Sequence, residues 1–297
     1  MDRHPLLAEA RTIQDWIVAL RRELHQYPEV CYEEVRTSAL VRKTLDALKI
    51  SYRYPLAQTG VVATLGNGRE PCVALRADMD ALPIHEQSGV PFSSTIDGKM
   101  HACGHDCHTA MLLGAAKLLK NREASLPGTV KLFFQPAEEG GAGGRRLCDE
   151  GAMDNPKVER IFGLHVWPDM PSDHIGSRAG VFLAAAGEVT ITIAGKGGHA
   201  AMPHRAIDPV ATAAKVICEL QTIVSRESDP FEPSVVSMTS IHGGAAFNVI
   251  PEEVRIMGTV RSLTVPGLDV LKARIVEIAT HVAAGNRNNN ELRKQQQ

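Results

Sequence analysis

The chain has 297 residues, in which 32 lysine and arginine residues stand against 34 aspartate and glutamate residues, so the formal net charge is −2. This balance excludes broad electrostatic attraction to nucleic acid or to an anionic membrane surface. With 44% hydrophobic and 22% charged residues, the composition is typical of a folded globular protein. The length allows one large domain or two ordinary ones.

The N-terminal segment and the cysteines bear on the compartment. Residues 1–24 carry charges throughout and lack the basic, apolar and small-residue order of a secretory signal, so we expect a cytoplasmic protein. We also expect no membrane-spanning helix, because no run of about 20 apolar residues occurs in the sequence. The cysteines number six and follow no paired spacing, which predicts reduced thiols rather than a disulfide scaffold.

The first 184 residues alternate between helical and strand patterns. Apolar residues recur at helical spacing in residues 6–26, 33–48 and 109–120, and a shorter helix is expected at 144–150. Short β-rich runs bounded by turn residues predict strands at residues 60–65, 72–76, 129–134 and 161–166. Several of these strands are apolar on both faces. This favours an α/β fold, a three-layer domain over residues 1–184 in which helices flank a mostly parallel sheet.

The pattern changes near residue 185, where a second and smaller α+β domain is predicted. A strictly alternating strand at 188–194 is followed by a helix at 208–224, strands at 234–241 and 253–261, and a helix at 268–283. This order is five sixths of a split βαβ, ferredoxin-like arrangement. Residues 286–297 are dominated by Asn and Gln, so we expect a disordered tail and a domain, 185–285, that lacks its closing strand.

Side chains that bind metals are concentrated in one short segment. The sequence HACGHDCH, residues 101–108, places five imidazole or thiol side chains directly before a helix. Imidazole nitrogen and thiolate are typical ligands of zinc and related ions, and Gly104 lets the backbone bend so that Cys103 and His105 can face one ion. The alternative is a polar loop of solvated histidines, which such crowding disfavours.

Carboxylates and one further histidine follow three of the predicted strands. Asp78 and Asp80 end one strand at positions i and i+2, on one side of it. Glu138 and Glu139 follow the next strand, and His165 lies near the end of a third. Taken singly, each could be a turn cap, a solvated helix start or a core histidine. Parallel strands end at one edge, however, so we expect these groups together, with one glutamate binding metal and the other free as a general base.

Two further interpretations concern residues outside that set. A thiol nucleophile at Cys103 or Cys107 is possible at a helix start, but the nearby acidic side chains would oppose a thiolate. In the second domain, His199 lies in a glycine-rich turn and Asn248 lies between two strands. From the residues alone, hairpin-turn chemistry is the favoured interpretation of both.

Six sequence blocks, in order, resemble a known family. They are RADMDALPI, GKMHACGHDCHTAMLLGAAKLL, FFQPAEEGGAGG, FGLHVWP, GKGGHAAMPHRAIDPV and FNVIPEEV. From about Leu20 to Gly285 the chain is similar to the aminoacylase/carboxypeptidase-G-type metallopeptidases, and within them to plant auxin-conjugate (indole-3-acetyl-amino acid) hydrolases and bacterial hippurate hydrolases. The resemblance implies a catalytic domain with a smaller lid, two divalent ions (manganese or zinc), a homodimer, and hydrolysis of small-molecule N-acyl amino acids.

Matched position by position, the resemblance implies a role for eight residues. The implied metal ligands are Cys103, His105, Glu139 and His165. Glu138 resembles the general base, and Asp80 resembles the carboxylate that orients a ligand. His199 and Asn248 of the lid resemble groups that bind the scissile carbonyl or the substrate carboxylate, which replaces the hairpin-turn interpretation.

The chain departs from the family at both ends. Relatives return from the lid to the catalytic domain with one more histidine ligand, whereas here the match stops after Gly285 and the last histidine, His281, lies inside a predicted helix. We therefore expect a C-terminally truncated chain, and the alternative to an active hydrolase is a non-catalytic product that retains partial metal binding. Plant relatives also carry a secretory signal and often lie in the endoplasmic reticulum lumen.

Overall fold

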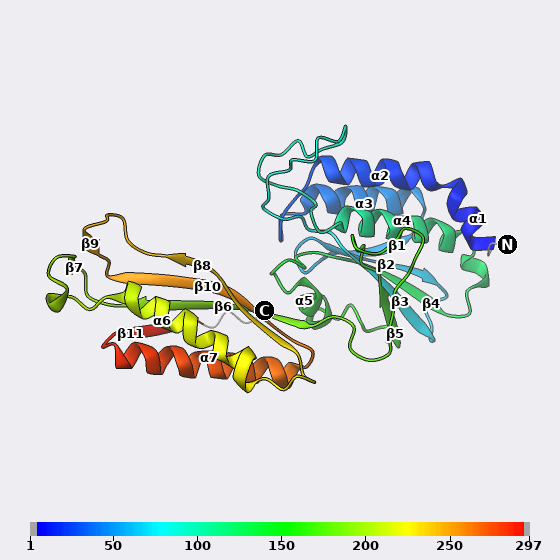
Figure 1. Ribbon diagram of the computed structural model, residues 1–297. Helices are drawn as coiled ribbons and strands as arrows, with labels where there is room; N and C mark the ends of the chain where they lie inside the picture. The colour runs from blue at the N-terminus through cyan, green and yellow to red at the C-terminus, as the bar shows by residue number, and fades with distance from the viewer. Residues whose placement is uncertain (1–4, 294–297) are drawn as a thin grey trace. The chain divides into compact units, whose positions relative to one another are not determined.

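The computed structural model describes the backbone of residues 5–293 and the side chains of residues 5–288 (Figure 1). The chain divides into two compact units, unit 1 (Met1–Ser172) and unit 2 (Asp173–Gln297). The sequence pattern predicts this boundary after residue 184 rather than after Ser172. The residues between the two positions, 173–184, are exposed and form neither helix nor strand, so their side chains carry no periodic pattern that would assign them to a unit.

Unit 1 begins with helices and contains two more after its first strands. They are α1 (Pro5–Thr12), α2 (Gln14–Gln26), α3 (Val35–Ala47), α4 (His105–Lys120) and α5 (Gly143–Asp149), with a 3₁₀ turn at Glu123–Ser125. The single helix predicted at 6–26 is divided at Ile13, where the backbone leaves the helical region (φ −111°, ψ 9°). Helix α4 begins at His105, before the predicted residue 109, so its first turn lies inside the metal-ligand segment.

The sheet of unit 1 is mixed. Its strands are β1 (Ser51–Leu56), β2 (Gly60–Gly66), β3 (Cys72–Asp78), β4 (Thr129–Gln135) and β5 (Arg160–Gly163). The order is β1-β2-β4-β3-β5, in which β3 runs parallel to β4 and β5 while β1 and β2 pair antiparallel. The α/β class is confirmed, and the parallel pairing is confined to the three strands that end near the predicted site.

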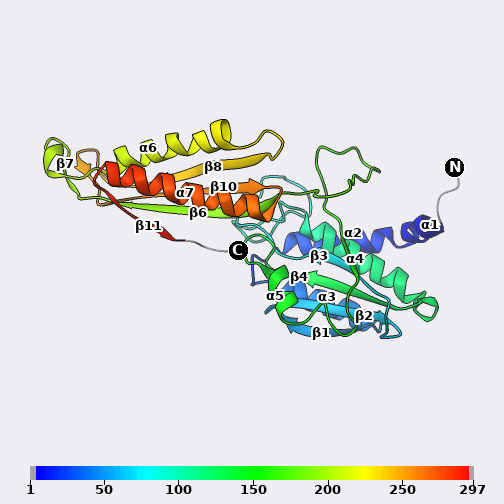
Figure 2. The same cartoon turned by 90° about the horizontal axis from the view of Figure 1, so that it is seen from below.

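Helices cover both faces of this sheet. Figures 1 and 2 show α2, α3 and α4 over one face, with α5 against the other. Phe133 and Phe134 are neighbours in β4 and pack into opposite layers, Phe134 with Leu45 and Leu113 of the helices, Phe133 with Leu147 of α5. Successive side chains of a strand point to opposite faces, so both phenylalanines are buried.

Unit 2 has the split βαβ arrangement in full. Its main sheet contains β6 (Ala185–Ala194), β8 (Ser234–His242), β10 (Glu253–Ser262) and β11 (Asn289–Arg293), in the order β11-β6-β10-β8 with every pairing antiparallel. Helices α6 (Pro209–Thr222) and α7 (Val265–Gly285) cover one face (Figure 2), and a π-helical turn, Ile223–Glu227, extends α6. Asp208 caps α6 as its sequence predicts, because its carboxylate accepts the backbone N–H groups of Val210 and Ala211.

The prediction of a disordered tail without a closing strand is wrong for residues 286–293. Strand β11 pairs with β6 from Asn289↔Ala194 to Arg293↔Thr190 and supplies the sixth element. The polar composition of this segment did not indicate a strand, because pairing with β6 uses backbone N–H and C=O groups, which every residue from Asn289 to Arg293 has. The buried Asn288 also anchors the strand start, since its side chain accepts the Thr212 hydroxyl (2.7 Å) and donates to the Ala194 carbonyl (3.3 Å). Residues 294–297 lie outside the described residues.

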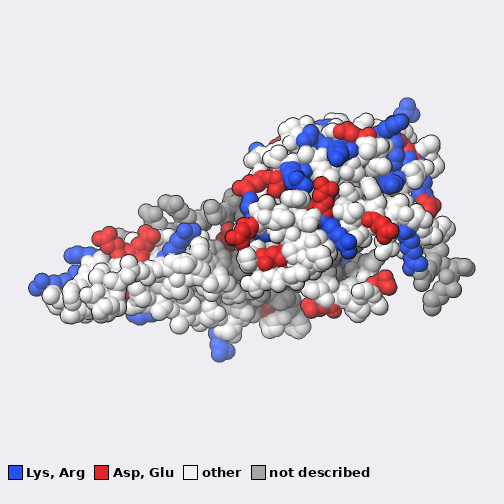
Figure 3. Space-filling view, turned by 90° about the horizontal axis from the view of Figure 1, so that it is seen from above, with Lys and Arg blue, Asp and Glu red and all other residues white. Residues whose placement is uncertain are grey.

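Two surface properties were also predicted. None of the helices in the described part of the chain is both long enough and apolar enough to cross a lipid bilayer. Figure 3 shows a face on which basic and acidic side chains of unit 1 are interspersed rather than separated by sign, as the small net charge suggests.

Candidate metal centre

Three strand ends and one helix start bring the predicted side chains of unit 1 together. Strands β3, β4 and β5 are parallel, so their carboxyl ends lie at one edge of the sheet. The segments that follow these strands carry Asp80, the Glu138–Glu139 pair and His165, and α4 begins with His105 beside them. The side chains form three groups in which the ligand atoms all lie within 4.8 Å of one another, and each group contains His105. The groups are Cys103, His105 and His165; His105, Glu138 and Glu139; and Asp78, His105 and His108.

His105 is the centre of this cluster and is fully buried. Its Nδ1 lies 3.3 Å from Asp80 Oδ1, an acceptor that keeps a proton on Nδ1. Its Nε2 is buried without a hydrogen-bond partner in the described residues. A buried ring nitrogen that faces two carboxylates fits a metal ligand whose orientation a third carboxylate fixes. The residues present therefore fit a divalent cation.

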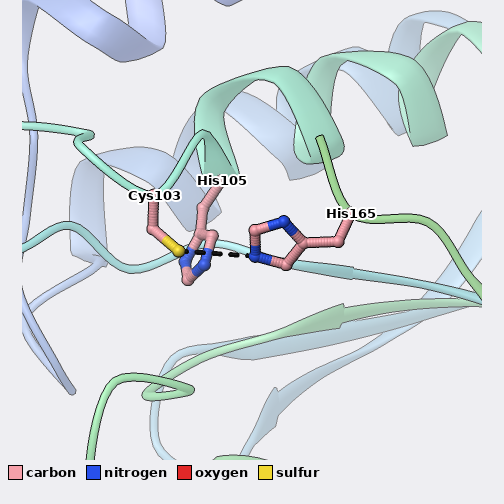
Figure 4. Close-up of side chains that lie close together, drawn as sticks. All are labelled: Cys103, His105 and His165. Atoms are coloured by element: carbon pink, nitrogen blue, oxygen red, sulfur yellow. Dashed lines mark hydrogen bonds between the residues drawn. The ribbon is translucent and has the colours of Figure 1, made fainter. Parts of the chain in front are cut away.

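Cys103 and His165 approach His105 from two different segments (Figure 4). His165 Nδ1 donates to the carbonyl oxygen of Val166 (2.7 Å), which leaves the lone pair on Nε2. That Nε2 lies 3.4 Å from Cys103 Sγ. Both atoms are thus available to a soft or borderline metal ion such as zinc.

The two adjacent glutamates differ in how they are held. Glu139 donates its backbone N–H to Asp80 Oδ2 (2.8 Å), so Asp80 fixes both His105 and the loop that carries Glu139. The Glu138 side chain is 42% exposed and the Glu139 side chain 23%. Burial raises the pKa of Glu138, and the charges of Asp78 and Glu139 raise it further. A partly exposed carboxylate with a raised pKa suits a group that takes up and releases a proton.

The charge of the cluster is strongly negative. Burial acts to lower the pKa of His105, but hydrogen bonds to Asp80 and Cys103 and the charge of Asp78 outweigh it and raise that pKa to about 11. Such a shift shows that the surrounding groups stabilise positive charge at the position of this ring. A bound divalent cation would satisfy the same demand.

His108, from the same sequence segment, has a structural role. Its Nδ1 donates to Asp78 Oδ1 (2.6 Å), and its Nε2 accepts the backbone N–H of Val166 (2.9 Å). Both ring nitrogens are therefore occupied. Asp78 is likewise paired with Arg76 (2.6 Å), so these groups fix the segment that carries His165 rather than offering free ligand atoms.

Glu34 is a positioning residue that the sequence analysis did not identify. Its buried carboxylate accepts hydrogen bonds from the Thr59 hydroxyl (2.5 Å) and from the N–H groups of Tyr32 (3.1 Å) and Ala137 (2.8 Å). Ala137 precedes Glu138 and has a left-handed backbone (φ 52°), which is unfavourable for a residue with a Cβ. Glu34 thus holds the start of the glutamate loop. In the sequence, Glu34 is only an acidic residue before a helix, and nothing near it indicates a contact with the glutamate loop.

A second unpredicted feature is a buried chain of charged groups behind the HACGHDCH segment. Asp106 Oδ2 lies 2.7 Å from Arg21 Nε and 2.8 Å from His25 Nδ1, and His25 Nε2 lies 3.1 Å from Glu86. These contacts join α2, α4 and the loop before α4. Asp106 follows His105 in the chain, so the network fixes the first turn of α4.

The thiol-nucleophile alternative gains no support at Cys107. Burial raises the pKa of its thiol, and the charge of Asp106 raises it further. A raised pKa disfavours the thiolate that a nucleophile requires. Cys103 lies with His105 and His165, a grouping that suits a metal ligand.

His199 and Asn248 lie together in unit 2. Strand β7 (Gly198–His199) pairs with β9 (Val249–Ile250), and the N–H of Ala200 donates to the Asn248 carbonyl (3.0 Å). His199 Nδ1 accepts the N–H of Ala201 (3.1 Å), so the proton of a neutral ring is on Nε2, where it can be donated to an oxygen atom. The last histidine, His281, lies in α7 and bonds the carbonyl of Glu277.

The sequence that forms this site matches a known protein family. The pattern that defines peptidase family M20/M25/M40 matches residues 74–269, which include the predicted ligands. The chain belongs to this family. The predicted family resemblance of this M20 chain is therefore confirmed.

Relatives from plants and bacteria match most of this M20 chain. It is 51% identical over 280 residues to IAA-amino acid hydrolase ILR1-like 5 of Arabidopsis thaliana, covering 94% of this chain and 64% of that protein. It is 43% identical over 274 residues to N-acetyl-L-cysteine deacetylase of Bacillus subtilis (strain 168), covering 92% and 65%. The chain thus spans less than two thirds of the length of these curated relatives.

Two solved structures have the same fold as this chain. A protein described as an aminohydrolase of methicillin resistant Staphylococcus aureus superposes with a TM-score of 0.85 at 32% identity, covering 97% of this chain and 77% of that chain. The Bacillus subtilis YXEP protein, described as a dinuclear metal binding peptidase from the M20 family, gives 0.74 at 38% identity, covering 95% and 74%.

Proposed function

We propose that the chain acts in a metal-dependent amidohydrolase that cleaves the amide bond of N-acyl amino acids, with indole-3-acetyl-amino acids as the leading substrates. The observation that carries the proposal is the buried Nε2 of His105, which has no hydrogen-bond partner in the described side chains and lies among Cys103, His165 and the two glutamates. The names of two relatives, an IAA-amino acid hydrolase and an N-acetyl-L-cysteine deacetylase, support an acylated amino acid as the substrate class.

Four side chains would hold the metal, which we propose to be two divalent ions, manganese or zinc. They are Cys103, His105, Glu139 and His165. The YXEP relative, described as dinuclear, supports the number of ions. When bound, such ions polarise the amide carbonyl and lower the pKa of an attacking water.

The remaining proposed roles belong to groups of the chain itself. Glu138 would take a proton from the attacking water and deliver it to the leaving amine nitrogen, since its raised pKa and partial exposure suit both steps. Asp80 would keep His105 in the tautomer that presents Nε2.

Unit 2 would act as the lid, in a protein that pairs as a homodimer. There, His199 Nε2–H would donate to the carbonyl oxygen as negative charge develops on it, and Asn248 would bind the substrate carboxylate.

The test combines metal analysis with turnover. The purified chain is loaded with Zn²⁺ or Mn²⁺, its metal content is measured, and indole-3-acetyl-alanine and N-acetyl-alanine are assayed before and after chelation. Metal binding with chelator-sensitive release of the amino acid supports the proposal. Metal binding without turnover of either compound favours the alternative, a non-catalytic product, and turnover that survives chelation contradicts a metal-dependent mechanism.

A further inference from the structure

A cavity of about 620 Å³ in unit 1 opens beside the candidate metal centre. Two predicted ligands, Cys103 and His165, form part of its wall. The wall continues into apolar and aromatic side chains that the metal centre does not use, Phe92, Val166, Trp167 and Pro168. We name this cavity the Phe92–Trp167 pocket. It lies entirely within unit 1, and its volume exceeds that of a bicyclic aromatic group.

The aromatic side chains of this pocket are placed by specific contacts. The guanidinium carbons of Arg21 and Arg22 lie 4.8 and 5.0 Å from the centroid of the Phe92 ring, and the His25 ring meets Phe92 edge to face at 5.7 Å. Trp167 lies edge to face with His165 at 6.4 Å. The contacts of Phe92 restrict its ring before any ligand binds, which lowers the entropy lost on binding, and Trp167, which is 55% exposed, adds an accessible indole surface.

The charged groups in the wall are already paired with one another. Arg21 pairs with Asp106, and His25 lies between Asp106 and Glu86. A ligand carboxylate would therefore have to compete with a protein carboxylate for each cation. The pocket is better suited to an uncharged group with a large apolar surface than to the carboxylate of an amino acid.

The position of the general base decides which half of a substrate can enter. This step rests on the proposed function. Glu138 must reach the leaving nitrogen, so the amino-acid half of the substrate has to lie on the side of Glu138. The acyl half leaves the reacting carbonyl in the other direction. Neither Glu138 nor Glu139 lines the pocket, whereas Cys103 and His165 do.

We infer that the Phe92–Trp167 pocket binds the acyl group of the substrate and selects aromatic acyl groups, such as indolyl and phenyl, over acetyl. The aromatic walls gain stacking contacts and apolar burial from a flat ring that a methyl group cannot provide.

The experiment compares Phe92→Leu and Trp167→Leu with a matched control, Phe162→Leu. Trp167 and Phe162 are 55% and 56% exposed, but Phe162 lies outside the pocket wall. Leucine keeps an apolar side chain, and a thermal melt of each variant checks folding. The dissociation constants of indole-3-acetate, phenylacetate and acetate are measured by NMR titration of the Zn²⁺-loaded full chain. kcat/KM is then measured for the matching alanine conjugates.

The expected result is that Phe92→Leu and Trp167→Leu weaken the binding of both aromatic acids by about fivefold to tenfold, while acetate binding and the Phe162→Leu control change less than twofold. kcat/KM should fall for the aromatic conjugates alone. Equal losses for acetate and aromatic acids, or equal effects of Trp167→Leu and Phe162→Leu, would overturn the inference. If no conjugate is hydrolysed but the aromatic acids still lose affinity in both pocket variants, the hydrolase function fails and the pocket assignment stands.

Discussion

Unit 1 buries charged side chains, whereas the buried polar residues of unit 2 are uncharged. In unit 1 the buried groups include four carboxylates, several histidines and Lys131, and the carboxylates are Glu34, Asp78, Asp80 and Asp106. In the described part of unit 2, the buried polar residues are Thr212, Ser262 and Asn288. Both units contain a conventional apolar core in addition.

The difference separates a unit whose described core is apolar and neutral from one that also holds the candidate metal centre. Burying a charge costs several kcal/mol unless it is paired and hydrogen-bonded, so an apolar core is the more stable choice. Unit 1 instead buries charged side chains around the sheet edge where the predicted ligands lie. Nearly every one of these buried charges has a partner. Among the ring nitrogens of the predicted ligands His105 and His165, the Nε2 of His105 has no hydrogen-bond partner in residues 5–288.

The largest expected effect concerns the reactive carboxylate of unit 1. Glu138→Gln should lower turnover by about 100-fold or more, because the amide keeps the size of the side chain but cannot accept a proton. Metal content should remain unchanged. Glu188→Gln, an exposed glutamate in β6 of unit 2, is the control and should have no effect. Steady-state kinetics and metal analysis measure both, and a rate within threefold of the wild-type value would contradict the assignment.

A second prediction compares buried polar groups across the units. Glu34→Ala leaves three donors without their acceptor and should lower the free energy of unfolding by about 2–4 kcal/mol. Thr212→Val in unit 2 removes one neutral hydroxyl and should lower it by about 1 kcal/mol. Denaturant titration gives both values. Similar losses would mean that buried charge in unit 1 is no more consequential than the neutral contacts of unit 2.

The two thiols in the ligand segment should behave differently. Cys103→Ala should weaken metal binding by about tenfold or more, because it removes a ligand atom beside His165. Cys107→Ala should leave the metal affinity unchanged, since that thiol contacts the Arg21–Asp106 pair instead. Titration with a competing chelator measures both affinities, and equal losses would show that Cys103 is not the ligand.

The smallest effect is a pH dependence of stability in unit 1. The hydrogen bond to Asp106 raises the pKa of His25 above 6.5, burial opposes this, and Glu86 reinforces it. The stabilisation from protonated His25 is therefore fully present below pH 6.5 and is lost as the pH rises through the folded-state pKa. In thermal melts between pH 5.5 and 8.5, wild type should lose more stability as the pH rises than His25→Gln does. The exposed His204→Gln should follow the wild-type curve.

Most of the fold and of the candidate site could be predicted from local sequence patterns. Strongly periodic segments such as 109–120 and 188–194 were found, as were residues whose chemistry is concentrated in a motif, such as Cys103 and His105. Strand β1 was missed although SYRYPL alternates, because it contains a proline, which edge strands tolerate but which counts against a strand in a sequence.

Roles that depend on distant partners were not predictable. Glu34 acts on Ala137, 103 positions away in the chain, and His25 acts on Asp106, 81 positions away. No spacing within a segment can reveal such pairs. For the same reason the HACGHDCH motif alone could not show that both ring nitrogens of His108 are occupied by contacts made only in the folded chain.

Gly104 shows where the ligand segment should be least tolerant of mutation. It lies between Cys103 and His105, starts α4 with φ +82°, and leaves no room for a Cβ, which would collide with Val166. Every substitution there meets both backbone strain and a steric clash. In a saturation-mutagenesis scan of residues 101–108, Gly104 should tolerate as few substitutions as the predicted metal ligands, although it has no side chain.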